Sequence, residues 1–326
     1  MSFKTLKRQL LLVPILSLSL VLGCNRKSDS NAPASGTSHT IAVIPKGTTH
    51  IYWQSVRAGA KAAADELGYQ IQWNGPERET DRERQIQIIE DFIVQRVDGI
   101  VLAPLDRHAL VPSVEKLASL NVPCVIIDSG IDTDKYVCFA ATDNYQGGAL
   151  AARRMGAILQ GKGKVVVLKY VPGSASTTER ENGFLETLAK EFPGIEMVDA
   201  KYGQDTVETA LQATEDLLTR HPDLQGLFAC NASTCVGAFQ GLQSQNRTEV
   251  KMVGFDAEKA VLDGLRAGQI DALVVQNPFK MGYEGVKAVV ARIKGQSVVK
   301  HIDTGVELIT KANLEDPRIK QLLNLQ

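Results

Sequence analysis

Polar side chains follow the apolar, strand-like runs of this 326-residue chain at the point where each run ends. The series consists of Lys46 to His50, Asp106, Asp128 with Ser129, Asn231, Asp256, and Gln276 with Asn277. Carboxylates accept hydrogen bonds, amides both donate and accept them, and a lysine ammonium donates them. Taken singly, Asn231 or Asp256 also suits the N-cap of the helix that follows. Six positions at the same end of their runs favour a shared binding site for a polar ligand.

The elements that carry these positions form two groups, in which short apolar runs alternate with amphipathic stretches. In the first group we expect strands at 40–45, 69–73, 99–103, 124–128 and 137–142, and helices at 52–67, 82–95 and 110–120. In the second we expect helices at 145–159, 178–191, 207–220, 234–243 and 260–267, alternating with strands at 164–168, 195–200, 226–229, 251–255 and 272–276. A last helix at 281–293 and a short terminal segment remain.

Strands that are apolar throughout are typical of parallel sheets covered by helices on both faces. The sequence therefore predicts an α/β protein with two doubly wound parallel-sheet lobes. In such sheets ligands gather beyond the carboxyl ends of the strands, where the polar series lies. The charged start of the helix at 82–95, with the letters ETDRER, is interpreted as a solvated face.

Motifs for catalysis are not found in the sequence. The loop PKGTTH after the first strand has neither the glycines of a dinucleotide fingerprint nor those of a P-loop. A Gly-x-Ser-x-Gly elbow is also missing. The five histidines, at 39, 50, 108, 221 and 301, lack metal-ligand spacing, and only His50 falls in the polar series. We therefore predict no catalytic residue, no metal and no cofactor.

The N-terminus has the pattern of an export signal: Lys4, Lys7 and Arg8 precede an apolar run over 10–22. This run is shorter than the roughly 20 residues that a membrane-spanning helix needs. The ending Val-Leu-Gly-Cys resembles a bacterial lipobox, which implies that Cys24 is lipidated and becomes the first residue of the mature chain. Plain cleavage without lipid is the alternative.

Residues 25–38 are rich in Ser, Asn, Ala, Pro and Gly, which is typical of a flexible linker. We predict a signal peptide over 1–23 and a lipidated tether over 24–39, so that the body lies in the periplasm or at the cell surface. Removing residues 1–23 removes three positive charges and changes the net charge from -1 to -4. Such a mildly acidic body is poorly suited to nucleic acid.

Four further cysteines, Cys124, Cys138, Cys230 and Cys235, lie in or beside apolar runs. An oxidising compartment would allow disulfides, and Cys124 with Cys138 is the pair to test because the two fall on consecutive strands. Buried free thiols that act as small apolar residues are the favoured alternative.

Several fragments of the chain, in this order and spacing, resemble the periplasmic ribose-binding protein family, the sugar-binding components of bacterial uptake transporters. The fragments are TIAVIPKGTTHIYWQSVRAGAKAAADELGY, VPCVIID, ATDNYQGGALAA, TTERENGF, LLTRHPDLQGLFACN, MVGFD, GQIDALVVQNP and MGYEGV. The family shares its fold with LacI-type repressors. A repressor is excluded here because a signal and a linker, not a DNA-reading helix pair, precede Thr40.

The resemblance implies an N-terminal lobe of residues 40–142 plus 277–305 and a C-terminal lobe of 143–276 plus 306–326. Three crossings join the lobes, which would close by hinge motion over a small polyhydroxy ligand. The resemblance further implies a monomer that delivers this ligand to an ABC-type permease. The alternative is a sensory protein that presents its ligand to a membrane receptor.

The resemblance also implies the ligand-binding residues. They are His50, Tyr52, Trp53, Asp128, Arg180, Asn231, Phe255, Asp256 and Gln276, with Lys46, Ser129 and Tyr202 as further candidates. Ser129 and Ala232 depart from the ribose binders, which usually have an arginine and an acidic residue there, so the ligand class is predicted and no particular sugar. Core packing is the alternative for Trp53 and Phe255, and an ion pair across an empty cleft is the alternative for Asp128 and Arg180.

Overall fold

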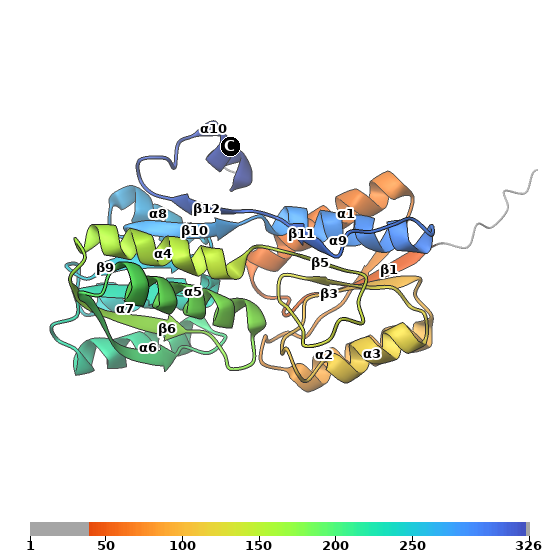
Figure 1. The fold of residues 1–326 in the computed structure, drawn as a ribbon, viewed down its shortest axis with the longest axis horizontal. Coiled ribbons are helices and arrows are strands. Elements are labelled where there is room, and N and C mark those ends of the chain that lie inside the picture. The colour runs from red at the N-terminus through yellow and green to blue at the C-terminus, as the bar shows by residue number, and fades with distance from the viewer. Residues whose placement is uncertain (1–38, 324–326) are drawn as a thin grey trace, which may run out of the picture. The chain divides into compact units, whose positions relative to one another are not determined.

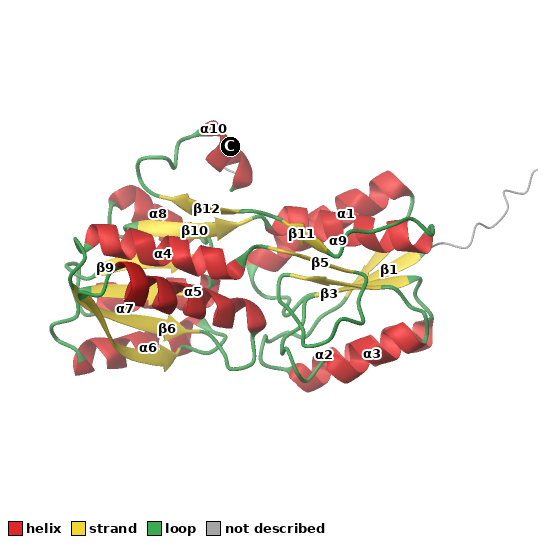
Figure 2. Cartoon of the chain, in the orientation of Figure 1, coloured by secondary structure: helices red, strands yellow, loops and turns green. Residues whose placement is uncertain are grey.

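The structure is a computed structural model that describes residues 39–323 (Figure 1). The signal, Cys24 and most of the predicted tether lie outside the described residues. Within them the chain forms two six-stranded sheets, each with helices on both faces (Figure 2). The predicted fold class, two doubly wound α/β lobes, is confirmed.

The first lobe contains a fully parallel sheet in the order β11-β5-β4-β3-β1-β2. Its strands are β1 (Thr40–Ile44), β2 (Gln70–Trp73), β3 (Gly99–Leu102), β4 (Cys124–Ile127), β5 (Cys138–Ala141) and β11 (His301–Asp303). Helices α1 (Ile51–Leu67) and α9 (Pro278–Ile293) cover one face, and α2 (Arg82–Gln95) and α3 (Val111–Ser119) cover the other. Alternate residues of β1 face the two apolar layers, because Ile41 packs in one and Ala42 in the other.

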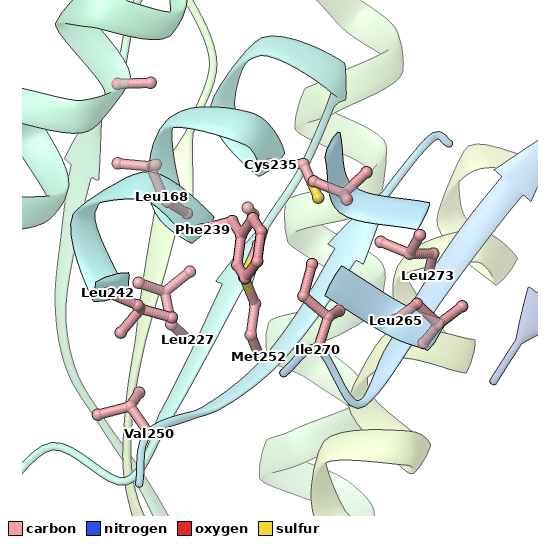
Figure 3. Close-up of a cluster of buried hydrophobic side chains, with 14 of the residues drawn as sticks. Leu168, Leu227, Cys235, Phe239, Leu242, Val250, Met252, Leu265, Ile270 and Leu273 are labelled. Carbon is pink, nitrogen blue, oxygen red and sulfur yellow. The ribbon is translucent and has the colours of Figure 1, made fainter. Parts of the chain in front are cut away.

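The second lobe contains the order β12-β10-β9-β8-β6-β7, with β12 antiparallel to β10 at the edge. Its strands are β6 (Gly163–Lys169), β7 (Ile195–Tyr202), β8 (Gly226–Ala229), β9 (Lys251–Phe255), β10 (Ala272–Gln276) and β12 (Val306–Ile309). Its helices are α4 (Asn144–Ile158), α5 (Ala175–Glu191), α6 (Val207–Arg220), α7 (Ala232–Ser244), α8 (Lys259–Ala267) and the short α10 (Pro317–Leu322). One apolar layer lies under α6, α7 and α8, where Phe239 packs among Leu242, Met252 and Leu265 (Figure 3). The other lies under α4 and α5.

Three helices begin two or three residues before the predicted start. Helix α9 begins at Pro278, with Asn277 as its N-cap, and not at 281. Helix α5 begins at Ala175, three residues before the predicted start, because Ser174 takes the extended N-cap conformation and its carbonyl accepts from Thr178 N. Helix α7 begins at Ala232, because Asn231 and Thr234 form a reciprocal capping box. Serine and threonine have weak helix propensity, so the sequence pattern did not reveal the first turn of α5 or of α7.

The first lobe depends on a close approach of α1 and α9. A Cβ atom on Gly59 would lie 1.9 Å from the carbonyl oxygen of Phe279, and one on Gly282 would lie 2.0 Å from that of Val56. Glycine at both positions therefore allows the two helix backbones to touch.

The four described cysteines are buried free thiols, so the Cys124–Cys138 disulfide is not formed. Burial raises the pKa of Cys124 to about 12 and, with a smaller contribution from Glu284, that of Cys138 to about 11. Over residues 39–323, no helix is long and apolar enough to cross a membrane.

Candidate functional site

A cavity lies where the carboxyl ends of the strands of the two lobes face each other. It encloses about 390 Å³ of space between atoms, part of it open to solvent. Nine of the predicted site residues line it: Lys46, His50, Tyr52, Trp53, Asp128, Arg180, Asn231, Asp256 and Gln276.

Asp128 and Asp256 occupy corresponding positions in the two lobes. Asp128 directly follows β4 and Asp256 directly follows β9, and each of these strands is the fourth of its sheet in chain order. Both have left-handed backbones, with φ of 63° and 69°, which aspartate tolerates better than most residues. Their backbone N–H groups donate to Ala140 and Val274 on the neighbouring strands, at 3.2 and 2.8 Å. The sheet ladder thus ends at a carboxylate in each lobe.

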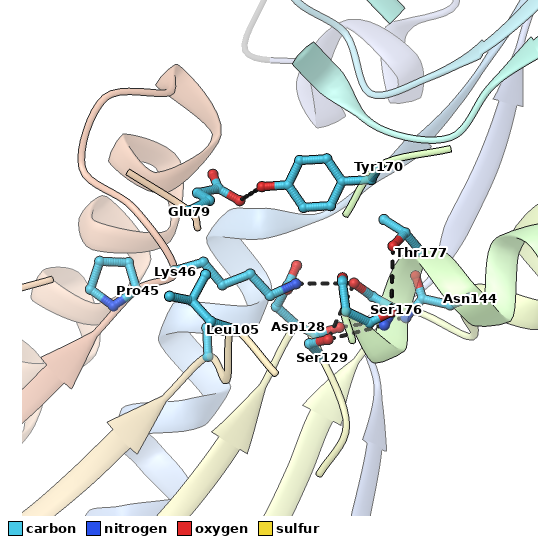
Figure 4. Close-up of polar contacts among 12 residues, drawn as sticks. Pro45, Lys46, Glu79, Leu105, Asp128, Ser129, Asn144, Tyr170, Ser176 and Thr177 are labelled. Carbon is cyan, nitrogen blue, oxygen red and sulfur yellow. Dashed lines mark hydrogen bonds and ion pairs between the residues drawn. The ribbon is translucent and has the colours of Figure 1, made fainter. Parts of the chain in front are cut away.

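The Asp128 carboxylate is paired with groups of its own lobe. Lys46 Nζ lies 2.7 Å from Oδ2, and the Tyr52 hydroxyl donates to Oδ1 at 2.8 Å. Burial, followed by the charge of Asp128, raises the pKa of Tyr52 well above its ordinary value, so this hydroxyl keeps its proton. The alternative expectation of an Asp128–Arg180 ion pair is not met among the described residues, because Lys46 supplies the counter-charge. Lys46 also donates to Ser176 of the second lobe at 3.1 Å (Figure 4).

Asp256 accepts hydrogen bonds from Gln276 Nε2 at 2.7 Å and from the Ala232 N–H at 3.1 Å. Its pKa is raised because burial disfavours the charged form more than Arg180 and Gln276 favour it. Gln276 Oε1 is buried and has no hydrogen-bond partner within the described residues, and Asp128 Oδ2 is contacted there by the Lys46 ammonium. Gln276 Oε1 is therefore left for a ligand that donates, and each carboxylate oxygen of Asp128 can accept a further hydrogen bond beside its present partner.

Arg180 on α5 is only 2% exposed and is held by the second lobe. Its Nε donates to Asn144 Oδ1 at 2.8 Å, and its Nη1 donates to the Cys230 carbonyl at 3.0 Å. The guanidinium lies 3.8 Å from the centroid of the Phe255 ring. A guanidinium has five N–H donors, so several remain for a ligand. Phe255 is fully buried beneath Arg180 and does not line the cavity.

Two aromatic rings of α1 form an apolar wall. The Tyr52 and Trp53 rings meet edge to face, with centroids 5.0 Å apart. His50 is the N-cap of α1, and its side chain makes no cap bond. Instead its Nε2 lies 3.8 Å from Glu79.

Four strand-end or candidate residues lie elsewhere. Ser129 accepts from the Ser176 N–H at 3.0 Å, outside the cavity lining. Tyr202 is 40% exposed at the end of β7, with Lys169 above its ring. Asp106 accepts from the N–H groups of His108 and Ala109 in the turn before α3, and Asn277 caps α9. The capping interpretation therefore describes Asn277, whereas Asp106 stabilises a turn and makes no cap bond to α3.

Six lining residues were not predicted: Glu79, Tyr170, Ser176, Thr177, Ala232 and Ser233. Tyr170 lies two residues beyond the predicted strand at 164–168 and directly after β6, so the strand-end rule that selected the other candidates could have found it. Glu79 lies in the charged run that was interpreted as a solvated face. The structure corrects that interpretation at this residue, because Glu79 is only 9% exposed.

Two α/β lobes around a cavity of convergent polar groups define the class of two-lobed solute-binding proteins. Residues 41–297 match the family model of the periplasmic binding protein domain, and the chain belongs to this family. The resemblance drawn from the sequence is thereby confirmed.

The relatives include sugar-binding proteins of known structure. A carbohydrate transporter solute-binding protein from Agrobacterium radiobacter, solved in complex with D-arabinose, is 38% identical with a TM-score of 0.86, covering 89% of this chain and 100% of that one. An ABC transporter solute-binding protein from Agrobacterium vitis, bound with α-D-tagatopyranose, is 32% identical with a TM-score of 0.84, covering 87% and 99%. The ribose import binding protein of Bacillus subtilis (strain 168) is 27% identical over 94% of this chain and 100% of its own length.

Proposed function

We propose that this protein is an extracytoplasmic solute-binding protein that captures a small sugar or sugar alcohol between its lobes and delivers it, chemically unchanged, to an ABC-type permease. The ligands named for its relatives, D-arabinose and α-D-tagatopyranose, belong to this chemical class.

One observation carries the proposal: the cavity combines acceptors from both lobes that can take further hydrogen bonds with unused donors. Gln276 Oε1 lacks a hydrogen-bond partner among residues 39–323, the Asp128 carboxylate has only Lys46 and Tyr52 as partners, and Arg180 keeps spare N–H groups. A sugar hydroxyl both donates and accepts, so adjacent hydroxyls can satisfy both kinds of group. The C–H face of a sugar ring would pack against the Tyr52–Trp53 wall.

Ligand binding is proposed for the nine predicted residues that line the cavity, with Phe255 supporting Arg180 from below. The lobe limits, 40–142 plus 277–305 and 143–276 plus 306–326, are part of the proposal. They agree with the assignment of β11 to the first sheet and β12 to the second. The proposal further includes a monomer, tethered to the membrane through a lipid on Cys24.

A thermal-shift screen of pentoses, hexoses and polyols tests the proposed function, followed by calorimetry on each stabiliser. A ligand at about 100 times its Kd adds roughly 2.7 kcal/mol to the free energy of unfolding. We expect stabilisation by one sugar or a few closely related ones, and chromatography should recover the sugar intact. A screen without any stabiliser, or recovery of a converted product, would contradict the proposal.

A further inference from the structure

The loop between β2 and α2 reaches the second lobe with several side chains. Arg78 Nη2 donates to Asp205 at 2.6 Å, and Thr80 donates to the same carboxylate at 3.1 Å. Arg82 Nη2 donates to the Pro172 carbonyl at 2.7 Å. The donors Arg78 and Thr80 are exposed at the rim, while their acceptor Asp205 is only 4% exposed.

Glu79 is the buried member of this loop, and its two oxygens bond to different lobes. Oε1 accepts from Trp53 Nε1 of the first lobe at 2.6 Å. Oε2 accepts from the Tyr170 hydroxyl of the second lobe at 2.6 Å (Figure 4). A single carboxylate therefore links the aromatic wall of the cavity to the opposite lobe.

The surroundings hold Glu79 in this position. A Cβ atom on Gly47 would lie 2.7 Å from Glu79 Cγ, so only glycine there leaves room for the side chain. Tyr170 is buried in the core of the second lobe. Burial, followed by the charge of Glu79, raises the pKa of Tyr170 well above its ordinary value, so its hydroxyl remains a donor.

We propose that Glu79 is a positioning residue that couples lobe closure to the aromatic wall. The Tyr170–Glu79 bond requires the two lobes to meet, and the Glu79–Trp53 bond holds the indole against the ligand. The bond would thus add to the lifetime of the closed, sugar-bound form. This inference rests on the proposed sugar-binding function.

Tyr170→Phe tests the cross-lobe bond because it removes only the hydroxyl and leaves the ring packing in place. Tyr145→Phe is the matched control: the Tyr145 hydroxyl donates to Glu186 at 2.7 Å, but this bond lies within the second lobe and at the surface. Glu79→Gln tests the carboxylate with little change in volume. The sequence has two tryptophans, so a Trp73→Phe background isolates the fluorescence of Trp53.

The probes are D-arabinose and D-tagatose, with stopped-flow kinetics on whichever binds. A hydrogen bond to a charged group contributes about 1.5–3 kcal/mol, which corresponds to a roughly 10- to 100-fold faster dissociation of the sugar from Tyr170→Phe. We expect the association rate and the melting temperature of the sugar-free protein to stay close to those of the parent. The sugar-induced change in Trp53 fluorescence should shrink in Glu79→Gln and Tyr170→Phe and remain in Tyr145→Phe.

Small-angle scattering of the sugar-free proteins separates this inference from the proposed function. A larger radius of gyration in Tyr170→Phe than in Tyr145→Phe would support the cross-lobe bond even if neither sugar binds the parent protein, a result that would count against the proposed function alone. If Tyr170→Phe matches Tyr145→Phe in scattering, and in dissociation rate wherever a sugar binds, the coupling role of Glu79 is refuted. A lowered melting temperature with unchanged kinetics would likewise assign Glu79 a merely structural role.

Discussion

The substitution Asp256→Asn should raise the stability of the unliganded protein and lower its affinity for the ligand. The carboxylate is buried, and its raised pKa means that the folded protein disfavours its charge despite the nearby Arg180. Asparagine tolerates the left-handed backbone at φ 69° and can still accept one of the bonds from Gln276 and Ala232. The substitution therefore removes the charge with little change in shape.

The size of the affinity loss follows from the type of hydrogen bond. Bonds to charged groups contribute about 1.5–3 kcal/mol and neutral ones about 0.5–1.5, so the variant should lose about 1–2 kcal/mol of binding free energy, or roughly 5- to 30-fold in Kd. The melting temperature of the sugar-free protein should rise, by about 2–4 °C for each 1 kcal/mol gained.

The difference in stability between the wild-type protein and Asp256→Asn should change with pH in a definite direction. Because the pKa of Asp256 is higher in the folded than in the unfolded chain, the folded state binds more protons as the pH falls toward 3.8. Protonation removes the unfavourable buried charge from the folded wild-type protein. The amount by which the wild-type protein is less stable than Asp256→Asn should therefore be largest at neutral pH and shrink on acidification.

Asp106→Asn is the control, because this substitution is expected to lower the stability of the protein and not to raise it. Burial raises the pKa of Asp106, but the N–H groups of Ala109 and His108 and the charge of Arg82 outweigh it, so the net pKa is lowered. This charge is favoured in the folded state, and its loss should lower the melting temperature without changing the Kd. Titration calorimetry for the Kd and differential scanning calorimetry for the melting temperature, on both variants, test these expectations. A lower melting temperature in sugar-free Asp256→Asn at pH 7 would refute the reasoning.

Three further predictions concern the charged residues of the site, the anchor and the thiols. Arg180→Ala and Asp128→Ala should each weaken binding by about 2–5 kcal/mol in calorimetry, and Arg180→Lys should not restore full affinity because an ammonium lacks the planar fork of donors. Unchanged affinity in Arg180→Ala would remove that residue from the site. Cys24→Ala should release the protein into the soluble periplasmic fraction, and a variant that stays on the membrane would exclude the lipid as anchor. Cys124 and Cys138 should react with a thiol reagent only after unfolding, since burial raises both pKa values; rapid reaction of the folded protein would contradict their burial.

The central strands of the sheets were predictable because they are apolar and buried on both faces. The run at 124–128, for example, has the length and composition of a buried strand, and β4 spans Cys124–Ile127. Strand β12 and helix α10 could not be recognised, because both are short and much of their surface is exposed. Their placement depends on the neighbouring β10, which periodicity within the segment does not reveal.

The site was predictable where a polar residue ends an apolar strand. Asp128 and Asp256 follow this rule, whereas Asp106 also ends a strand-like run but bonds to the turn before α3 and lies outside the cavity lining. Glu79 could not be found in this way, because its run of charges is typical of solvent exposure and its contacts with Trp53 and with Tyr170 of the other lobe are distant in the sequence. Contacts between lobes have no local signature in the sequence.

A crystal structure of the protein with the sugar selected by the thermal screen tests the central claim most directly. We predict that the sugar lies in the cavity between the lobes, with its hydroxyls donating to Asp128 Oδ2 and Gln276 Oε1 and accepting from Arg180. A sugar bound elsewhere, or one in the cavity that donates to neither Asp128 nor Gln276, would contradict it.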